Sequence, residues 1–294
     1  MTTFDDTFAR ERRRKTEELR ALGIDPFPVA GFHPDQTVAG ILEDPAAWID
    51  SGRVVRLAGR ITARRDMGRT VFIDLLDQGA RIQLMLTRAN LPETNWAAQR
   101  LLDLGDFVGV AGFITRTRAG ETTVAVQDLV VLSKAAHPIP LGKASAEGAH
   151  DAMSDPGMLA RMRHVGLNAD PDLRGRVLKR ARIIREVRRY FEEEGFVEVE
   201  TPILGVAYGG AAARPFTTHA NALDAELYLR ISPECSLKRV LCGGIHRVFE
   251  IGRNFRNEGI DASHNPEFTM MEWYEAWSDY RHQQKLREPD PALG

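Results

Sequence analysis

Short apolar runs separated by turn signals occupy residues 53–132, and they constrain the fold of this segment more than any other feature of the sequence. The runs are rich in Val, Ile, Leu and Phe. The turn signals between them are Met67-Gly68, Gln78-Gly79 and Ala119-Gly120. Several short strands at even spacing are typical of an all-β unit. The pattern therefore predicts a small antiparallel barrel.

A second β signal lies late in the chain, where two apolar runs flank a long polar loop. The runs are residues 247–253 and 268–274, and a hairpin is the simplest prediction for them. Because side chains alternate between the two faces of a strand, every second residue of the returning run shares one surface. That surface would carry an aromatic ring, a carboxylate and a phenol, from Phe268, Met270, Glu272 and Tyr274.

The loop of this hairpin carries residues suited to binding charged ligands. Arg256 can bind a phosphate or a carboxylate with two parallel hydrogen bonds, and Glu258 can accept from an amine. His264, Asn265 and Pro266 bend the chain back toward the second run. The alternative is an ordinary amphipathic hairpin whose apolar residues are core and whose loop charges are solvated.

A helix followed by a short strand is predicted before the hairpin. Apolar residues of the segment 176–196 recur at spacings of three and four, which places them on one helical face, and Gly195 is a plausible stop. These residues are Val177, Ala181, Ile184, Val187 and Phe191. The strand, residues 196–201, ends at Pro202, which cannot donate a ladder hydrogen bond. A generic surface helix remains the alternative for the helix alone.

Four stretches of sequence resemble the lysyl-tRNA synthetases of class IIb. FRNEG (255–259) and HNPEFTMMEWY (264–274) closely resemble motif 2 of class II aminoacyl-tRNA synthetases in its lysyl form, and GFVEVETPIL (195–204) is similar to motif 1, the dimer interface. The stretch YGGAAARPFTTHANALDAELYLRISPECSLKR (208–239) resembles the lysyl amino-acid pocket, although Cys235 and Ser236 replace a usual Leu-Tyr pair. LAGRITARRDMGRTVFIDLLDQGARIQLML (57–86) resembles the OB-fold anticodon-binding domain.

This resemblance implies an α+β chain, in which a five-stranded OB-fold barrel precedes a partial class II catalytic domain made of an antiparallel sheet with helices. The domains expected are an N-terminal helical extension (1–48), the OB-fold (49–134), a linker (135–175), the partial catalytic domain (176–280) and a polar tail (281–294). In the extension, residues 8–23 predict a charged helix closed by Gly23. A solvated helix is the default there, and contact with tRNA phosphates is the alternative.

The resemblance also implies a lysine–tRNA ligase, in which ATP activates lysine to lysyl-adenylate before transfer to tRNA(Lys). Arg256 would be the catalytic residue, bridging the lysine carboxylate and the α-phosphate. The ATP-binding residues would be Arg256, Glu258, His264, Asn265 and Phe268, the last stacking on adenine. The lysine-binding residues would be Gly210, Glu234, Arg256, Glu272 and Tyr274. Without the surrounding sequence, Glu234 would be read as a surface glutamate.

Three barrel residues would bind the anticodon. Phe72 would stack on a base while Gln83 and Glu121 read base edges, although each could instead be an ordinary barrel residue. Residues 53–88 contain eight arginines against three aspartates, a local surface that would attract phosphates. A solvated basic rim would have the same composition.

The family's third motif and its Mg²⁺ ligands find no counterpart before Gly294, so the sequence is expected to stop before motif 3. Mg²⁺ is expected for the family, and whether this chain is an active enzyme stays open. The alternative function is a truncated, catalytically deficient paralogue that binds tRNA or dimerises with a complete synthetase. A homodimer formed through the motif 1 region is expected.

The composition limits the classes of protein to which the chain can belong. With 294 residues, a net charge of −2 and 43% hydrophobic residues, the chain is typical of a two-domain cytoplasmic protein, and any RNA contact must be local. No apolar run approaches the roughly 20 residues needed to span a bilayer, so no membrane partner is expected. HExxH and P-loop patterns are absent, and Cys235 and Cys242 are too far apart for a CxxC pair, so no metal site is predicted.

Overall fold

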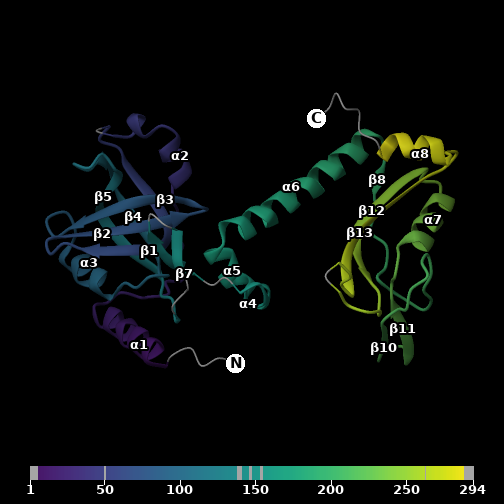
Figure 1. Ribbon diagram of the computed structural model, residues 1–294, viewed down its shortest axis with the longest axis horizontal. Helices are drawn as coiled ribbons and strands as arrows, with labels where there is room; N and C mark the ends of the chain where they lie inside the picture. The colour runs from purple at the N-terminus through teal and green to yellow at the C-terminus, as the bar shows by residue number, and fades with distance from the viewer. Residues whose placement is uncertain are drawn as a thin grey trace. The chain divides into compact units, whose positions relative to one another are not determined.

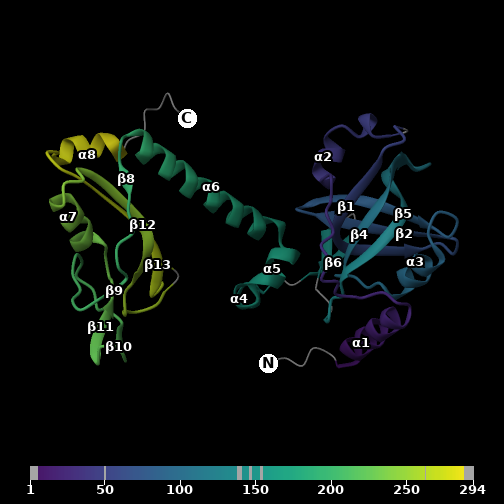
Figure 2. The same ribbon diagram turned by 180° about the vertical axis from the view of Figure 1, so that it is seen from behind.

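The computed structural model describes residues 6–49, 51–137, 141–145, 148–152, 155–261 and 263–287 (Figure 1 and Figure 2). The chain divides into two compact units, Met1–Arg176 and Val177–Gly294. Each unit has its own sheets and its own apolar core. Within the described residues, no helix is both long and apolar enough to cross a membrane.

The first unit is built on a closed five-stranded barrel, which confirms the prediction from the sequence. The strands are β1 (Val54–Asp66), β2 (Thr70–Asp77), β3 (Ala80–Thr87), β4 (Phe107–Arg116) and β5 (Thr122–Ser133). Around the barrel their order is β1-β2-β3-β5-β4. Neighbours are antiparallel except β3 and β5, which pair in parallel and close the barrel.

Alternation of side chains fills the barrel with aliphatic residues. Along β1, Val55, Leu57 and Ile61 are buried, and a register shift after Ile61 bends the strand. The β2–β3 turn is tight because Gln78 and Gly79 both adopt positive φ, of 47° and 106°. Two-residue hairpins of this kind match the twist of the flanking strands, so the turn signal read from the sequence fixes the register of β2 against β3.

Short helices surround the barrel. They are α1 (Asp6–Ala21), α2 (Val38–Glu43), η1 (Pro45–Ala47), α3 (Glu93–Ala98) and η2 (Gln99–Leu101). The charged helix α1 is bound to the barrel unit by Arg12, which is 8% exposed and donates to the carbonyls of Ala135 (2.7 Å) and Leu104 (2.9 Å). Lys15 adds an ion pair with Asp103 at 2.6 Å. One face of α1 is therefore buried, not solvated.

The interval expected to be a linker contains several short elements. A hairpin of β6 (Leu141–Ser145) and β7 (Gly148–Ala152) is followed by α4 (Pro156–Arg161) and α5 (Arg163–Ala169). The helix predicted for residues 176–196 is α6 (Pro171–Glu193), which starts earlier than expected and ends before Gly195, at φ 79°. The predicted strand over 196–201 is only β8 (Val197–Glu198).

The second unit is organised by a long hairpin of β12 (Arg247–Phe255) and β13 (Glu267–Glu275), which confirms the predicted hairpin. β8 pairs with β12 in parallel, giving the order β13-β12-β8. A second sheet has the order β10-β11-β9, from β9 (Leu204–Gly205), β10 (Thr217–Ala220) and β11 (Ala225–Leu229). Helix α7 (Glu234–Cys242) packs against both strands of the hairpin.

Aromatic rings form the core of the second unit. Phe191 of α6 lies 5.2 Å from Phe196, 5.4 Å from Phe249 and 5.2 Å from Trp273, measured between ring centroids. The segment expected to be a polar tail begins with helix α8 (Tyr280–Arg287), whose Leu286 joins this core. No helix was predicted there because a single buried leucine leaves no apolar period in the sequence.

Candidate functional site

The hairpin loop encloses a small cavity lined by charged and aromatic side chains. Its volume is about 220 Å³, and its lining is Arg256, Glu258, Gly259, Ser263, His264, Asn265 and Phe268. All five residues predicted to bind ATP are therefore neighbours. The Arg256 guanidinium lies 5.1 Å from the Phe268 ring centroid, within cation–π range. One wall is thus an aromatic face with a cation against it.

Local hydrogen bonds set the shape of this loop. The Asp261 carboxylate accepts from the backbone N–H of Ser263 (2.7 Å) and of His264 (2.8 Å), and it contacts His264 Nδ1 at 2.7 Å. The hydrogen bonds from Ser263 and His264 hold the pKa of Asp261 below its usual value. The Arg256 N–H donates to the Pro266 carbonyl at 2.9 Å and closes the loop. Asp261 therefore orients His264, a contribution that the sequence did not indicate.

Arg256 has hydrogen-bonding capacity left for a ligand. Its Nε is buried and has no hydrogen-bond partner among the described residues. A buried donor without an acceptor costs roughly 1–3 kcal/mol. Arg256 also lines the adjoining cavity, and guanidinium groups bind carboxylates and phosphates in bidentate fashion. An anionic ligand beside Arg256 is therefore favoured.

The predicted lysine-binding residues other than Arg256 gather around one serine. Ser232 Oγ donates to Glu272 Oε1 (2.7 Å) and accepts from the Glu234 N–H (3.1 Å). Tyr274 OH donates to Glu272 Oε2 at 3.1 Å, and burial together with the Glu272 carboxylate raises the pKa of Tyr274. Gly210 has φ 87°, and a Cβ there would lie 2.7 Å from Ser232 Oγ. Only glycine fits that position.

An ammonium group already contacts one of the two carboxylates. Lys238 Nζ lies 2.6 Å from Glu234 Oε1, one helical turn away, and 5.8 Å from the Tyr274 ring centroid. The hydrogen bond with Glu234 raises the pKa of Lys238. Two carboxylates and a phenol therefore form a cluster whose chemistry suits cationic groups.

A buried ion pair that the sequence analysis missed lies on the same face of the hairpin. Arg230, which is 8% exposed, pairs with Glu250 and donates to Thr201 Oγ1 at 2.9 Å. Its guanidinium lies so close to Gly252 that no Cβ could be accommodated there. A glycine inside a strand often marks a close approach of this kind, so Gly252 was the available signal. Glu250 stands directly opposite Glu272 in the ladder.

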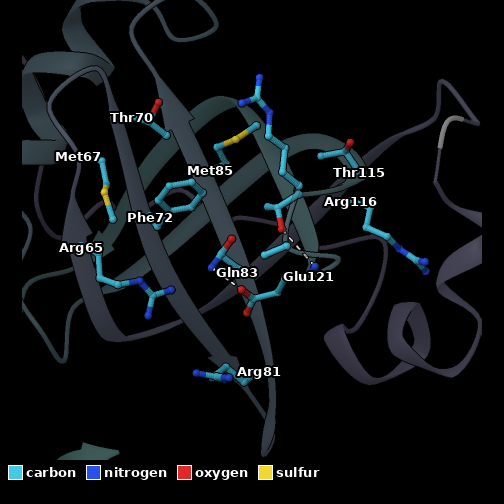
Figure 3. A pocket seen from close by; sticks show the side chains of 13 residues that line it. Arg65, Met67, Thr70, Phe72, Arg81, Gln83, Met85, Thr115, Arg116 and Glu121 are labelled. Carbon is cyan, nitrogen blue, oxygen red and sulfur yellow. Dashed lines mark hydrogen bonds between the residues drawn. The ribbon is translucent and has the colours of Figure 1, made fainter.

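The barrel carries a second, larger cavity of about 980 Å³. Phe72, Gln83 and Glu121 all line it, although they come from three different segments. Figure 3 shows the Phe72 ring between the side chains of Met67 and Met85 in this view, and the hydrogen bond from Gln83 Nε2 to Glu121 Oε2 at 2.7 Å. Thr123 Oγ1 lies 3.0 Å from Gln83 Oε1 and fixes the orientation of the amide.

Arginines surround this cavity. Arg65 and Arg81 form ion pairs with Asp74, which is 2% exposed, at 3.2 and 2.7 Å. Arg116 and Arg118 also belong to the lining. An aromatic ring and a basic rim are features with which single-stranded nucleic acids are bound.

Among the described residues, no group of three or more His, Cys, Asp or Glu side chains is arranged to hold a metal ion. Cys235 and Cys242 are exposed free thiols.

A closed barrel, followed by a hairpin that carries a loop cavity and a carboxylate cluster, is the arrangement expected of a class II tRNA synthetase with an OB-fold. Comparison with known families agrees: residues 155–289 match tRNA synthetases class II (D, K and N), and residues 55–132 match the OB-fold nucleic acid binding domain. Residues 155–289 therefore belong to the class II tRNA synthetase domains, and residues 55–132 to the OB-fold nucleic acid binding domains.

Within that family, the chain is similar to lysine–tRNA ligases. It is 43% identical over 284 residues to the lysine–tRNA ligase of Christiangramia forsetii, covering 94% of this chain and 49% of the relative. It is 42% identical over 279 residues to that of Thermoanaerobacter pseudethanolicus, covering 95% of this chain and 54% of the relative. The chain thus spans about half the length of these relatives.

Proposed function

We propose that the protein acts as a lysine–tRNA ligase, activating lysine with ATP and passing the lysyl group to tRNA(Lys). The observation that carries the proposal is the single face of the β12–β13 hairpin, which presents Phe268 of the loop cavity and the Glu272–Tyr274 pair of the ammonium cluster. In the first step, a carboxylate oxygen of lysine attacks the α-phosphorus of ATP and pyrophosphate leaves. In the second, a ribose hydroxyl of the terminal adenosine of tRNA attacks the lysyl carbonyl and releases AMP.

Arg256 has the central role in the first step. Its guanidinium binds the lysine carboxylate and the α-phosphate together, so that the reacting atoms are held close and the charge developing on phosphorus oxygens is neutralised. Phe268 stacks on adenine, while Glu258, His264 and Asn265 orient the nucleotide. Mg²⁺ accompanies ATP in phosphate-transfer reactions. The described residues contain no ready-made cluster of metal ligands, so no step is assigned to the metal.

The amino-acid site takes lysine through its two ammonium groups. Glu234 is proposed to bind one and Glu272, with Tyr274, the other; the bend at Gly210 leaves room for the ligand. Lys238, which contacts Glu234 at 2.6 Å, shows that an ammonium fits against this carboxylate. Lysine differs from most amino acids in carrying a second cation, and paired carboxylates favour it over neutral side chains.

The barrel is proposed to bind the anticodon of tRNA(Lys). Phe72 offers a stacking surface, and the polar pair of Gln83 and Glu121 offers donors and acceptors to a base edge. Under this proposal residues 49–134 form the anticodon-binding domain and residues 176–280 the catalytic part. Helix α6 exposes Val177, Leu178 and Ile183, at 46%, 54% and 55%, which supports a homodimer formed through the motif 1 region.

Lysine-dependent exchange of pyrophosphate into ATP tests the activity. We expect exchange with lysine and none with aspartate, and we expect Arg256→Ala to lower its rate by at least about 100-fold because a group that neutralises the transition state is lost. Arg253→Ala is the matched control, since Arg253 is half exposed and pairs only with Glu267 across the hairpin. Exchange unaffected by Arg256→Ala would refute the assignment. Binding of tRNA with no lysine-dependent exchange would favour a tRNA-binding paralogue instead.

A further inference from the structure

Ser232 occupies the centre of the amino-acid cluster, yet nothing in the family resemblance singles it out. It lies just before helix α7 and is 7% exposed. Its hydroxyl donates its one proton to Glu272 Oε1 and accepts from the Glu234 N–H. One atom therefore contacts both carboxylate-bearing residues of the site, which are far apart in sequence.

The hydrogen bond to Glu272 fixes the direction of a flexible side chain. Ser232 Oγ donates to Glu272 Oε1 and Tyr274 OH donates to Oε2, so each carboxylate oxygen accepts one hydrogen bond from a hydroxyl group. An ionised carboxylate accepts about four hydrogen bonds, so capacity remains for an incoming ammonium. Two anchored oxygens leave the carboxylate one orientation. Its charge is then positioned before the ligand arrives.

The backbone N–H of Glu234 donates to the same atom, which holds the start of helix α7 beside Ser232. Pro233 has no backbone N–H, so Glu234 offers the first backbone donor of the α7 helix, and Ser232 Oγ accepts it. Gly210 packs against the same hydroxyl, where a Cβ would lie 2.7 Å from Ser232 Oγ. Ser232 thus contacts the Glu272 carboxylate and the Glu234 backbone with one atom.

We propose that Ser232 is a positioning residue that tunes the amino-acid site for an ammonium-bearing side chain, an inference that rests on the proposed function. It acts through Glu272 and Glu234 and does not itself bind the substrate. Its hydroxyl fixes the direction of the Glu272 carboxylate and holds the Glu234 backbone beside it. Loss of the hydroxyl lets Glu272 turn away, so the site discriminates less well between a cationic and a neutral side chain.

The test compares lysine with norleucine, which lacks the side-chain ammonium. In Ser232→Ala we expect lysine to bind roughly tenfold more weakly by calorimetry, while ATP affinity and the weak binding of norleucine are unchanged, because only a hydrogen bond to a charged group is lost. In exchange kinetics the KM for lysine rises and kcat changes little. Tyr274→Phe, which removes the hydroxyl from the other Glu272 oxygen, should give the same lysine-selective loss.

Ser278→Ala is the matched control, because Ser278 Oγ also accepts a hydrogen bond in this unit, from Gln283, outside the cluster. Lysine affinity in Ser232→Ala equal to that of the parent and of the control overturns the inference. Equal weakening of lysine, norleucine and ATP overturns it too, since that pattern means a general structural role. A parent protein that binds no lysine refutes the proposed function itself, and the inference with it, before any substitution is made.

Discussion

The two faces of strand β2 differ: one faces the barrel core, and the other, which carries Phe72, lines the cavity. The neighbouring Val71 and Ile73 are fully buried inside the barrel, whereas Phe72 is only partly buried and lines the open cavity opposite Met85. The sequence left open whether this ring was core or binding surface. Its position on the outward face of β2 favours the binding surface.

Phe72→Ala should weaken binding of tRNA(Lys) by about 1–3 kcal/mol, the usual loss when a stacked base loses its aromatic partner. Phe107→Ala provides the control: Phe107 is also aromatic and partly exposed, but it stacks against Arg60 away from the cavity lining. Filter binding at fixed salt would measure both variants. Equal affinities for the two would argue against a stacking role for Phe72.

Contacts between residues close in sequence could be predicted, and contacts between residues far apart in sequence could not. The residues predicted to bind ATP come from one stretch, Arg256 to Phe268, so their shared cavity follows from a short piece of sequence. Ser232 was missed because its partner Glu272 is 40 positions away, and no periodicity links them. The Arg230–Glu250 pair was missed for the same reason. Tertiary packing, not local pattern, creates these contacts.

At the scale of elements, helix α1 was predicted as a helix, but its attachment to the barrel unit was not. Its charges suggest a solvated helix, but Arg12 is buried, and Lys134 pairs with Asp103 and Asp106 at 2.7 Å beneath it. Burial raises the pKa of Asp106 against the opposing effect of Lys134. A network of charges therefore fastens α1 to the barrel unit.

Arg12→Ala should destabilise the barrel unit by about 1–3 kcal/mol, because the carbonyls of Ala135 and Leu104 lose their donor. Arg14→Ala should change stability by less than about 0.5 kcal/mol, since Arg14 is exposed and pairs only with Glu11 and Glu18 of its own helix. Chemical denaturation of both variants checks the contrast. A smaller loss for Arg12 than for Arg14 would contradict the docking described for α1.

Elements with a strong hydrophobic period were predictable, and short or polar ones were not. The barrel strands and the β12–β13 hairpin alternate with period 2, and the structure has both. Helix α8 escaped prediction because tertiary contacts hold it: Tyr190 OH donates to the Leu286 carbonyl, and Trp273 Nε1 to Gln283. Such support cannot be seen in an isolated polar segment.

At the scale of the whole molecule, the two units have separate cores. Aliphatic side chains fill the barrel, while the second unit depends on a few stacked aromatic rings. Leu84 and Phe249 are fully buried, one in each core. Damage to one core should therefore leave the other intact.

Leu84→Ala should lower the stability of the barrel by about 2–5 kcal/mol, and Phe249→Ala that of the second unit by about 3–5 kcal/mol. Scanning calorimetry should resolve two transitions, with each substitution shifting only one. Each variant serves as the control for the other. A single transition that moves with both would mean that the units unfold as one.

The β12–β13 hairpin has a consequence for how such a site can change. Phe268 and Glu272 lie on one strand face, four residues apart, so about 13 Å of strand backbone separates the residues proposed to bind adenine and lysine. Point mutations can alter either end but not the length between them. The spacing along the strand therefore suits an aminoacyl-adenylate of one length. Only the insertion or deletion of a pair of residues could change this spacing and still keep both ends on the same face.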